Sequence, residues 1–187
     1  RRHLDWNDNY KYIVYAGKAG EKLKRIRTFV EASNAFTDTK FIVVGATKGL
    51  QKEYSDNTYG NLILYPFQTY PEYLNFVYAA DVLVSTYEDN LYNRYTLSPG
   101  KGGAYLQSGN PVIFSDLPSL KERFPDDLVS FVKPDDSEDL ILKIKDVISN
   151  YKTYQARAKN AAHFVSKQTF TDASAVILNK LNRILFN

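Results

Sequence analysis

Short apolar runs alternate with longer amphipathic stretches along this chain. Six runs of three to five residues end at glycine, proline or a polar residue, and they cover residues 12–16, 41–45, 62–65, 82–84, 111–114 and 128–132. Continuous apolar runs of this length are typical of strands that are buried on both faces of a parallel sheet. The pattern therefore predicts six buried strands.

The stretches between these runs carry apolar residues at helical spacing. The clearest is the stretch around Leu140, Ile144 and Val147, where Asp136 or Ser137 is a suitable N-cap. Proline at the first helical position and glycine after the last one mark further boundaries. We expect helices over residues 23–33, 71–80, 99–109, 140–148, 151–166 and 172–185, a capped helix start near Pro118, and a polar, tyrosine-rich loop over residues 87–97.

Strands that alternate with helices in this way predict an α/β fold. We expect a Rossmann-like, doubly wound parallel sheet of about six strands, with helices on both faces. Residues 12–187, including the C-terminal helices, form one domain, and residues 1–11 are an N-terminal tail or a linker between lobes. Ligands of such folds bind outside the carboxyl ends of the strands, so the chemistry should lie in the loops that follow them.

Composition narrows the function classes. With 44% hydrophobic and 24% charged residues, the chain is globular, and its net charge of +3 is too small to predict a nucleic-acid partner. Because cysteine is absent and histidine occurs twice, thiolate catalysis is excluded and a metal site is not expected. No apolar run approaches the roughly 20 residues that span a bilayer. The chain begins Arg1-Arg2 and lacks methionine, so we expect a fragment of a longer protein.

The first candidate binding loop follows the first strand and reads Gly17-Lys18-Ala19-Gly20-Glu21-Lys22. Glycine lets the backbone approach an anion closely, and Lys18 and Lys22 add positive charge, which suits a phosphate. The loop has neither the G-x-G-x-x-G fingerprint nor the G-K-[ST] of a Walker A loop. A Gly-Lys turn without any ligand is the alternative.

The second candidate loop follows the fourth strand and opens a helix. It reads Ser98-Pro99-Gly100-Lys101-Gly102-Gly103. Three glycines within four residues are costly for a helix, which indicates that a ligand needs close backbone access. Backbone N–H groups and the Lys101 ammonium would favour a diphosphate. The alternative is a tight turn packed against a neighbouring strand.

This second loop opens a run that resembles a known family. The run over residues 98–116, S-P-G-K-G-G-A-Y-L-Q-S-G-N-P-V-I-F-S-D, is similar to the S-P-x-K-x-x-E-Y-x-A-x-G-x-P-V-I-x-S-D segment of GT-B glycosyltransferases of group 1. Four further features agree in order with this family, from about residue 12 to residue 170: Gly17-Lys18 with Glu21-Lys22, Val43-Val44-Gly45, the stretch 61–81, and Pro134-Asp135-Asp136 before the Leu140 helix.

The resemblance implies the C-terminal, donor-binding lobe of a two-lobed glycosyltransferase. By this resemblance, Lys18 and Lys22 contact the donor diphosphate, Gly45 and Tyr65 surround the nucleotide base, and the loop with Ser98, Gly100, Lys101, Gly102 and Gly103 faces the diphosphate and sugar. The nucleotide-diphosphate sugar is a substrate, and no cofactor or metal is implied. The implied partners are a missing N-terminal lobe and a carbohydrate, lipid-linked or protein acceptor. The implied location is the cytoplasm, or a membrane periphery reached through the missing lobe.

One departure from the family concerns the ribose. Many members carry E-x7-E, whose second Glu contacts the ribose, whereas this chain has Thr96 and Ala104 at the two positions. Glu88 or Asp89 could replace the carboxylate, the ribose could be bound differently, or the site could be degenerate. A non-catalytic binding or assembly module, which Ala104 supports, is therefore one alternative function. An unrelated Rossmann-like enzyme such as a dehydrogenase is another, and the missing G-x-G-x-x-G fingerprint disfavours it.

Overall fold

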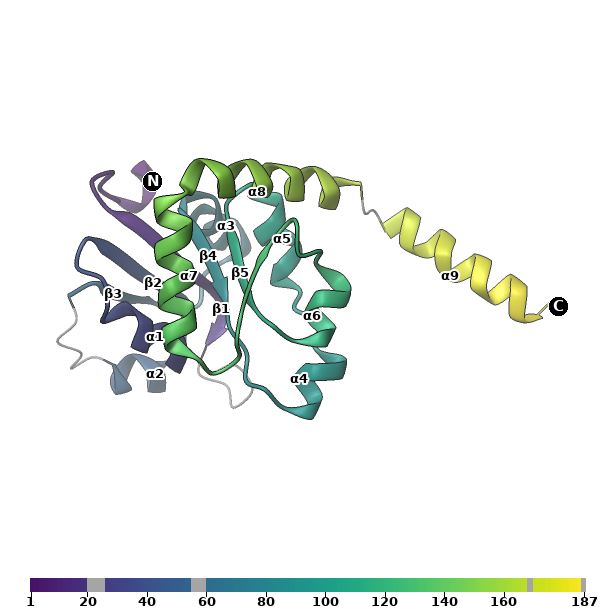
Figure 1. The fold of residues 1–187 in the computed structure, drawn as a ribbon, viewed down its shortest axis with the longest axis horizontal. Helices are drawn as coiled ribbons and strands as arrows, with labels where there is room; N and C mark the ends of the chain where they lie inside the picture. The colour runs from purple at the N-terminus through teal and green to yellow at the C-terminus, as the bar shows by residue number, and fades with distance from the viewer. Residues whose placement is uncertain (20–25, 55–59, 168–169, 186–187) are drawn as a thin grey trace.

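In a computed structural model, residues 1–19, 26–54, 60–167 and 170–185 are described. Six of their strands form one sheet in the order β3-β2-β1-β4-β5-β6, and every neighbouring pair is parallel (Figure 1). The strands are β1 (Lys11–Ala19), β2 (Thr39–Ala46), β3 (Leu62–Tyr65), β4 (Val82–Ser85), β5 (Val112–Ser115) and β6 (Ser130–Val132). The predicted doubly wound α/β fold is confirmed.

Helices cover both faces of this sheet. The α-helices are α1 (Arg27–Ser33), α2 (Lys48–Glu53), α3 (Tyr70–Ala79), α4 (Leu91–Thr96), α5 (Lys101–Gln107), α6 (Pro118–Arg123), α7 (Ser137–Ser149), α8 (Tyr151–Ser166) and α9 (Phe170–Leu185), and a short 3-10 helix, η1, spans Arg2–Leu4. One core joins α3, α5, α6 and α8 to the sheet, and a second core joins α1, α2 and α7 to its other face.

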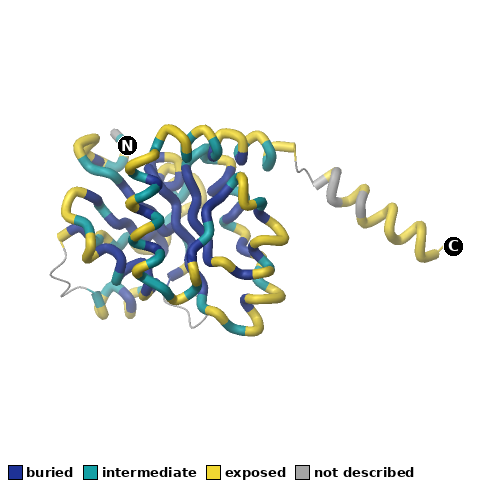
Figure 2. Tube along the Cα trace, viewed as in Figure 1, coloured by how far each residue is buried: buried dark blue, intermediate teal, exposed yellow. Residues whose placement is uncertain are grey.

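The two cores explain the apolar runs of the strands. Side chains alternate along β1, so that Val14 and Ala16 lie in the first core while Ile13 and Tyr15 lie in the second. All four are fully buried, and Figure 2 shows the buried strands between more exposed helices. A strand that is covered on both faces needs apolar residues at consecutive positions.

Asp136 and Pro71 lie at helix starts as predicted, and the structure adds a capping box at the second of them. The Asp136 carboxylate accepts a hydrogen bond from the Asp139 amide at 2.9 Å and caps α7. At α3, Thr69 and Glu72 form a capping box around Pro71, in which the Glu72 carboxylate accepts from the Thr69 amide at 3.0 Å.

Three local elements differ from the sequence prediction. β1 does not end at Gly17 but continues to Ala19, because its pairing with β2 resumes at Ala46 after a register shift. The predicted loop 87–97 contains α4, which Asn90 caps by accepting from the Asn93 amide at 2.9 Å. The unpredicted α2 begins after Thr47, whose hydroxyl accepts from the Leu50 amide.

The two ends of the chain differ in their packing. Near the N-terminus the Trp6 ring stacks on Tyr12 with a centroid distance of 4.1 Å, and Arg1 forms an ion pair of 2.6 Å with the buried Asp81. The domain boundary at residue 11 stays a prediction. At the other end, α9 projects away from the sheet (Figure 1). None of the described helices is both apolar and long enough to cross a bilayer.

Candidate functional site

The strand order creates a crevice between β1 and β4. These strands are neighbours, but the chain leaves β1 for the face covered by α1 and leaves β4 for the face covered by α5. Connections that diverge in this way open the sheet at the carboxyl ends of its strands, where ligands of such folds bind. Gly17 lies at this end of β1, and α5 brings Lys101 to the same place.

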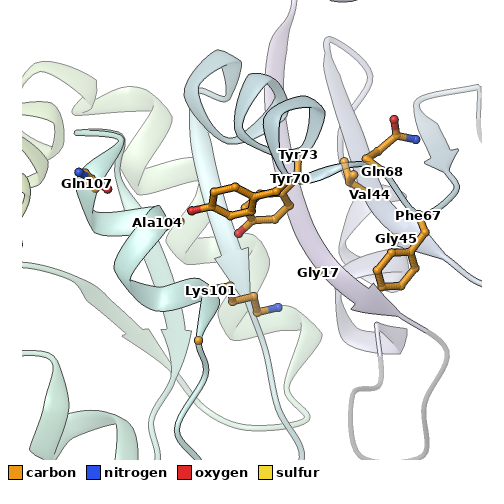
Figure 3. A pocket seen from close by; sticks show the side chains of 11 residues that line it. Gly17, Val44, Gly45, Phe67, Gln68, Tyr70, Tyr73, Lys101, Ala104 and Gln107 are labelled. Atoms are coloured by element: carbon orange, nitrogen blue, oxygen red, sulfur yellow. The ribbon is translucent and has the colours of Figure 1, made fainter. Parts of the chain in front are cut away.

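Two cavities open at this crevice, and Gly17, Gly100 and Lys101 line both. The α3-side cavity has a volume of about 450 Å³ and is shown in Figure 3. Its other lining residues are Val44, Gly45, Phe67, Gln68, Tyr70, Tyr73, Ala104 and Gln107. The α4-side cavity has a volume of about 420 Å³. Its other lining residues are Lys18, Tyr87, Tyr92, Asn93, Leu97, Ser98 and Pro99.

Two glycines let the ends of β1 and β2 approach each other. A Cβ atom on Gly45 would lie 2.4 Å from the carbonyl oxygen of Gly17, closer than any real contact allows. Both residues also have positive φ angles, +148° at Gly17 and +97° at Gly45, which other L-residues rarely adopt. The floor of the crevice therefore requires glycine at both positions.

Lys101 crosses this floor. Its side chain leaves the start of α5 and points toward β1 (Figure 3), where a Cβ atom on Gly17 would lie 3.1 Å from its Cδ. The Nζ atom lies 3.6 Å from the centroid of the Tyr15 ring, 5.5 Å from that of Tyr87 and 5.8 Å from that of Tyr105. The ammonium thus sits among aromatic faces, which attract a cation through their negative π-electron density.

These three tyrosines stay neutral at physiological pH. Burial raises the pKa of Tyr87 to about 12, and it also raises the pKa of Tyr15 and of Tyr105 above the ordinary value of a phenol. The Tyr105 hydroxyl is held by β1, because it accepts from the Ala16 amide at 2.7 Å and donates to the Ala16 carbonyl at 2.9 Å. Lys101 therefore meets neutral rings of fixed orientation.

Most of the predicted site residues line the crevice. Gly17, Gly45, Gly100 and Lys101 line the α3-side cavity, while Lys18 and Ser98 line the α4-side cavity. Lys22 lies outside the described residues. Tyr65 lines neither cavity and packs instead against Phe76, with a centroid distance of 4.6 Å.

The last two glycines of the second loop have other surroundings. A Cβ atom on Gly102 would lie 2.4 Å from the Phe124 ring, and the Gly102 amide already donates to the Pro99 carbonyl at 3.0 Å. The missing side chain at Gly102 thus serves packing against Phe124, and the predicted contact of its amide with a phosphate stays a prediction. Gly103 lines neither cavity.

The expected replacement for the ribose carboxylate is not among the described lining residues. Ala104 lines the α3-side cavity, whereas the Thr96 hydroxyl donates to the Tyr92 carbonyl at 2.7 Å and lines neither. Asp89 forms a bidentate ion pair with Arg94, and neither Asp89 nor Glu88 lines a cavity. In the described part of the chain, no three acidic or histidine side chains gather where they could hold a metal ion.

Aromatic residues after β3 were missed by the sequence interpretation. Phe67 and Tyr70 are 64% and 66% exposed and line the α3-side cavity together with Tyr73. Their position just beyond the carboxyl end of a predicted strand was a usable signal. The described lining of the two cavities thus combines two lysines, no carboxylate and an aromatic wall, an arrangement suited to an anion joined to a planar group.

Comparisons with known proteins agree with this fold. No family model and no curated protein matches the sequence. Among solved structures, sucrose-phosphate synthase from Thermosynechococcus elongatus is similar with a TM-score of 0.73 and 22% identity, covering 100% of this chain and 48% of its own. The C-terminal domain of a group 1 glycosyl transferase, LpcC from Francisella tularensis, has a TM-score of 0.66 and 20% identity, covering 85% of this chain and 86% of its own.

The chain has the fold of a GT-B glycosyltransferase C-terminal domain. HepE from Anabaena, solved in complex with UDP-glucose, shares this fold with a TM-score of 0.75 and 14% identity. It covers 94% of this chain and 49% of its own. The chain thus spans about half the length of HepE and of the sucrose-phosphate synthase.

Proposed function

We propose that this GT-B domain binds the nucleoside diphosphate part of a sugar donor and supplies the donor-binding half of a glycosyltransferase. The observation that carries the proposal is the position of Lys101. Its side chain crosses Gly17 at the topological switch point and lines both cavities there. With Lys18 in the lining and no carboxylate among the described lining residues, the crevice favours an anion.

The two cavities of the crevice support a ligand that has a base at one end and a sugar at the other. The α3-side cavity offers Phe67 and Tyr70 as stacking surfaces for a base, and the α4-side cavity offers room for a sugar on the other side of Lys101. The structures of HepE with UDP and with UDP-glucose support this assignment, because that protein shares the fold and holds such a donor.

The chemistry required of this half is charge stabilisation. When a glycosyl group leaves its donor, negative charge builds up on the diphosphate, and fixed cations lower the energy of that transition state. Lys101 and Lys18 are the described cations placed to do so. The acceptor would be bound by a second lobe, and the products would belong to polysaccharide, glycolipid or glycoprotein biosynthesis.

Calorimetric titration with UDP and with GDP tests this proposal. Lys101→Ala and Lys18→Ala should each weaken binding by about tenfold or more, since each removes a charge-assisted contact. Lys143→Ala is the matched control, because this lysine lies on α7 and pairs with Asp146 at 3.6 Å. Equal losses in all three variants, or no binding by the unmodified chain, would contradict the proposal.

A non-catalytic binding module is the second candidate. It is favoured by Ala104 and Thr96, which stand where the resemblance implies two carboxylates, and by the ion pair that occupies Asp89. The two candidates differ in turnover. A protein that contains this domain together with an acceptor lobe, binds UDP and transfers no sugar across a broad panel of donors and acceptors would favour the module.

A further inference from the structure

Of the three tyrosine rings around the Lys101 ammonium, that of Tyr15 is the nearest. The Nζ atom lies 3.6 Å from the centroid of this ring, compared with 5.5 Å for Tyr87 and 5.8 Å for Tyr105. A cation above the centre of a ring at this distance is attracted by the ring quadrupole, and the attraction grows where water is excluded.

Tyr15 is held in place from several directions. It belongs to β1, it is fully buried, and its ring packs against Phe29 with a centroid distance of 6.2 Å. Its hydroxyl donates to the Lys18 carbonyl at 3.5 Å, a weak contact at the edge of hydrogen-bond distance. The ring therefore presents one fixed face to the Lys101 ammonium, and this face does not depend on a strong hydrogen bond of the hydroxyl.

The path of the lysine side chain is fixed as well. Gly17 has no Cβ atom, and a Cβ atom there would lie 3.1 Å from the Lys101 Cδ and 3.4 Å from its Nζ. The missing side chain at Gly17 opens the route from α5 to the Tyr15 ring. Two residues of β1 therefore position this lysine. Gly17 leaves space for its side chain, and the Tyr15 ring contacts its ammonium group.

We propose that Tyr15 is a positioning residue for donor binding, whose ring face holds the Lys101 ammonium at the floor of the crevice. This inference rests on the proposed function, because the role of the held ammonium is to meet the donor diphosphate. It assigns the effect to the π face of Tyr15 and not to its hydroxyl. A lysine that is already ordered loses less side-chain freedom when the ligand binds, which increases affinity.

A set of variants separates this role from core packing. Tyr15→Phe keeps the ring face and should bind UDP within about twofold of the unmodified chain, whereas Tyr15→Leu should weaken binding by about tenfold. In the Lys101→Ala background, Tyr15→Leu should cause no further loss. A loss of equal size in that background would show that Tyr15 only supports the core, and a tenfold loss in Tyr15→Phe would assign the effect to the hydroxyl. Either result overturns the inference.

Fluorinated phenylalanines at position 15 provide the test if the leucine variant does not fold. Adding one, two and three fluorine atoms weakens the ring quadrupole stepwise while the ring keeps its shape, so log Kd for UDP should rise in proportion to fluorine number. An unchanged Kd across the series would overturn the inference.

A readout without ligand distinguishes this inference from the proposed function. In the nuclear magnetic resonance spectrum of the chain, the Lys101 Hε protons should show an upfield ring-current shift that Tyr15→Leu removes. Absence of this shift would overturn the placement of Lys101 on Tyr15, whatever the chain binds. If the shift is present and neither UDP nor GDP binds, the proposed function fails, and the role of Tyr15 in binding fails with it.

Discussion

At the scale of single residues, the geometry of the crevice requires glycines, because a Cβ atom at Gly17 or Gly45 would crowd its surroundings. Gly45 and Gly17 bring two strand ends together because neither has a side chain, and Gly17 also opens the path of Lys101. Gly102 and Gly103 are adjacent in α5 but have opposite surroundings. A Cβ atom on Gly102 would overlap Phe124, whereas one on Gly103 would meet no atom within 4 Å.

This contrast predicts opposite effects of alanine in α5. Gly102→Ala should lower the free energy of unfolding by about 1–3 kcal/mol, because Phe124 is buried and stacked on Phe114 and leaves no room for a methyl group. Gly103→Ala should raise it by about 0.5–1 kcal/mol, because alanine favours a helix more than glycine does. Urea denaturation of both variants measures the difference, and equal shifts would contradict it.

Ala104 provides a second prediction at this scale. Ala104→Glu would place a carboxylate in the α3-side cavity, where two ribose hydroxyls could donate to it. The affinity for UDP should then increase by about tenfold, the value of a good charge-assisted contact.

Pyrophosphate is the matched ligand for this variant because it has no ribose. Its affinity should fall, since a new negative charge near Lys101 repels it. Calorimetric titration of the Ala104→Glu variant with UDP and with pyrophosphate measures both changes in affinity. A weaker affinity for UDP in Ala104→Glu would show that the ribose does not lie beside position 104.

At the scale of elements, the last two helices differ in what they bury. α8 packs on the domain and buries Ala158 and Ala161, the second of which belongs to the core shared with α3 and α5. α9 is amphipathic and projects from the domain (Figure 1), and it leaves large apolar side chains exposed. They are Ile177, Leu178, Leu181, Ile184 and Leu185.

Removal of α9 should therefore leave the domain equally stable. A chain that ends at Lys167 should unfold within about 2 °C of the full chain, since surface changes are worth only about 0.5 kcal/mol. Ala161→Asp in α8 is the contrasting variant, because it buries a carboxylate and should cost several kcal/mol, roughly 2–5. Thermal unfolding followed by circular dichroism compares them. A large loss on truncation would show that α9 contributes to the core.

At the scale of the whole molecule, the crevice lies at one end of the sheet. The cavities lie at the carboxyl end of the sheet, and the chain spans about half the length of proteins such as HepE. Glycosyl transfer requires an acceptor hydroxyl at about 3–3.5 Å from the anomeric carbon, and this geometry must be held by binding groups on both reactants.

The chain of residues 1–187 should therefore bind a donor without transferring its sugar. In a coupled assay for UDP release from UDP-glucose, with and without a panel of acceptors, we expect no turnover above the uncatalysed rate. The same preparation should bind UDP in a calorimeter, which shows that the site is intact. Rapid turnover by this chain alone would contradict its assignment as a donor-binding half.

Local patterns in the sequence determined the elements. Six apolar runs specified six strands, because the inner strands β2, β1, β4 and β5 are covered on both faces and are apolar at nearly consecutive positions. The prediction that all six are buried is wrong for β3, which lies at the edge of the sheet and leaves Ile63 exposed. Asp136 and Pro71 marked helix starts, because an N-cap and a proline in the first turn act within a few residues of the helix end. α4 escaped prediction because its apolar residues, Leu91 and Tyr95, are exposed, and its cap by Asn90 resembles an ordinary turn.

Only the tertiary structure decided how distant residues meet. The order of the strands placed β1 beside β4, and with it placed Lys101 over Gly17 and against Tyr15, although α5 is remote from β1 along the chain. The tertiary structure also gave two nearby glycines different surroundings, since Gly100 lines the cavities and Gly102 packs on Phe124. A periodic pattern reports which face of an element is apolar, but not which residue of another element covers it. For this reason the sequence predicted a lysine and glycine site, whereas its aromatic surroundings emerged only when the sheet was assembled.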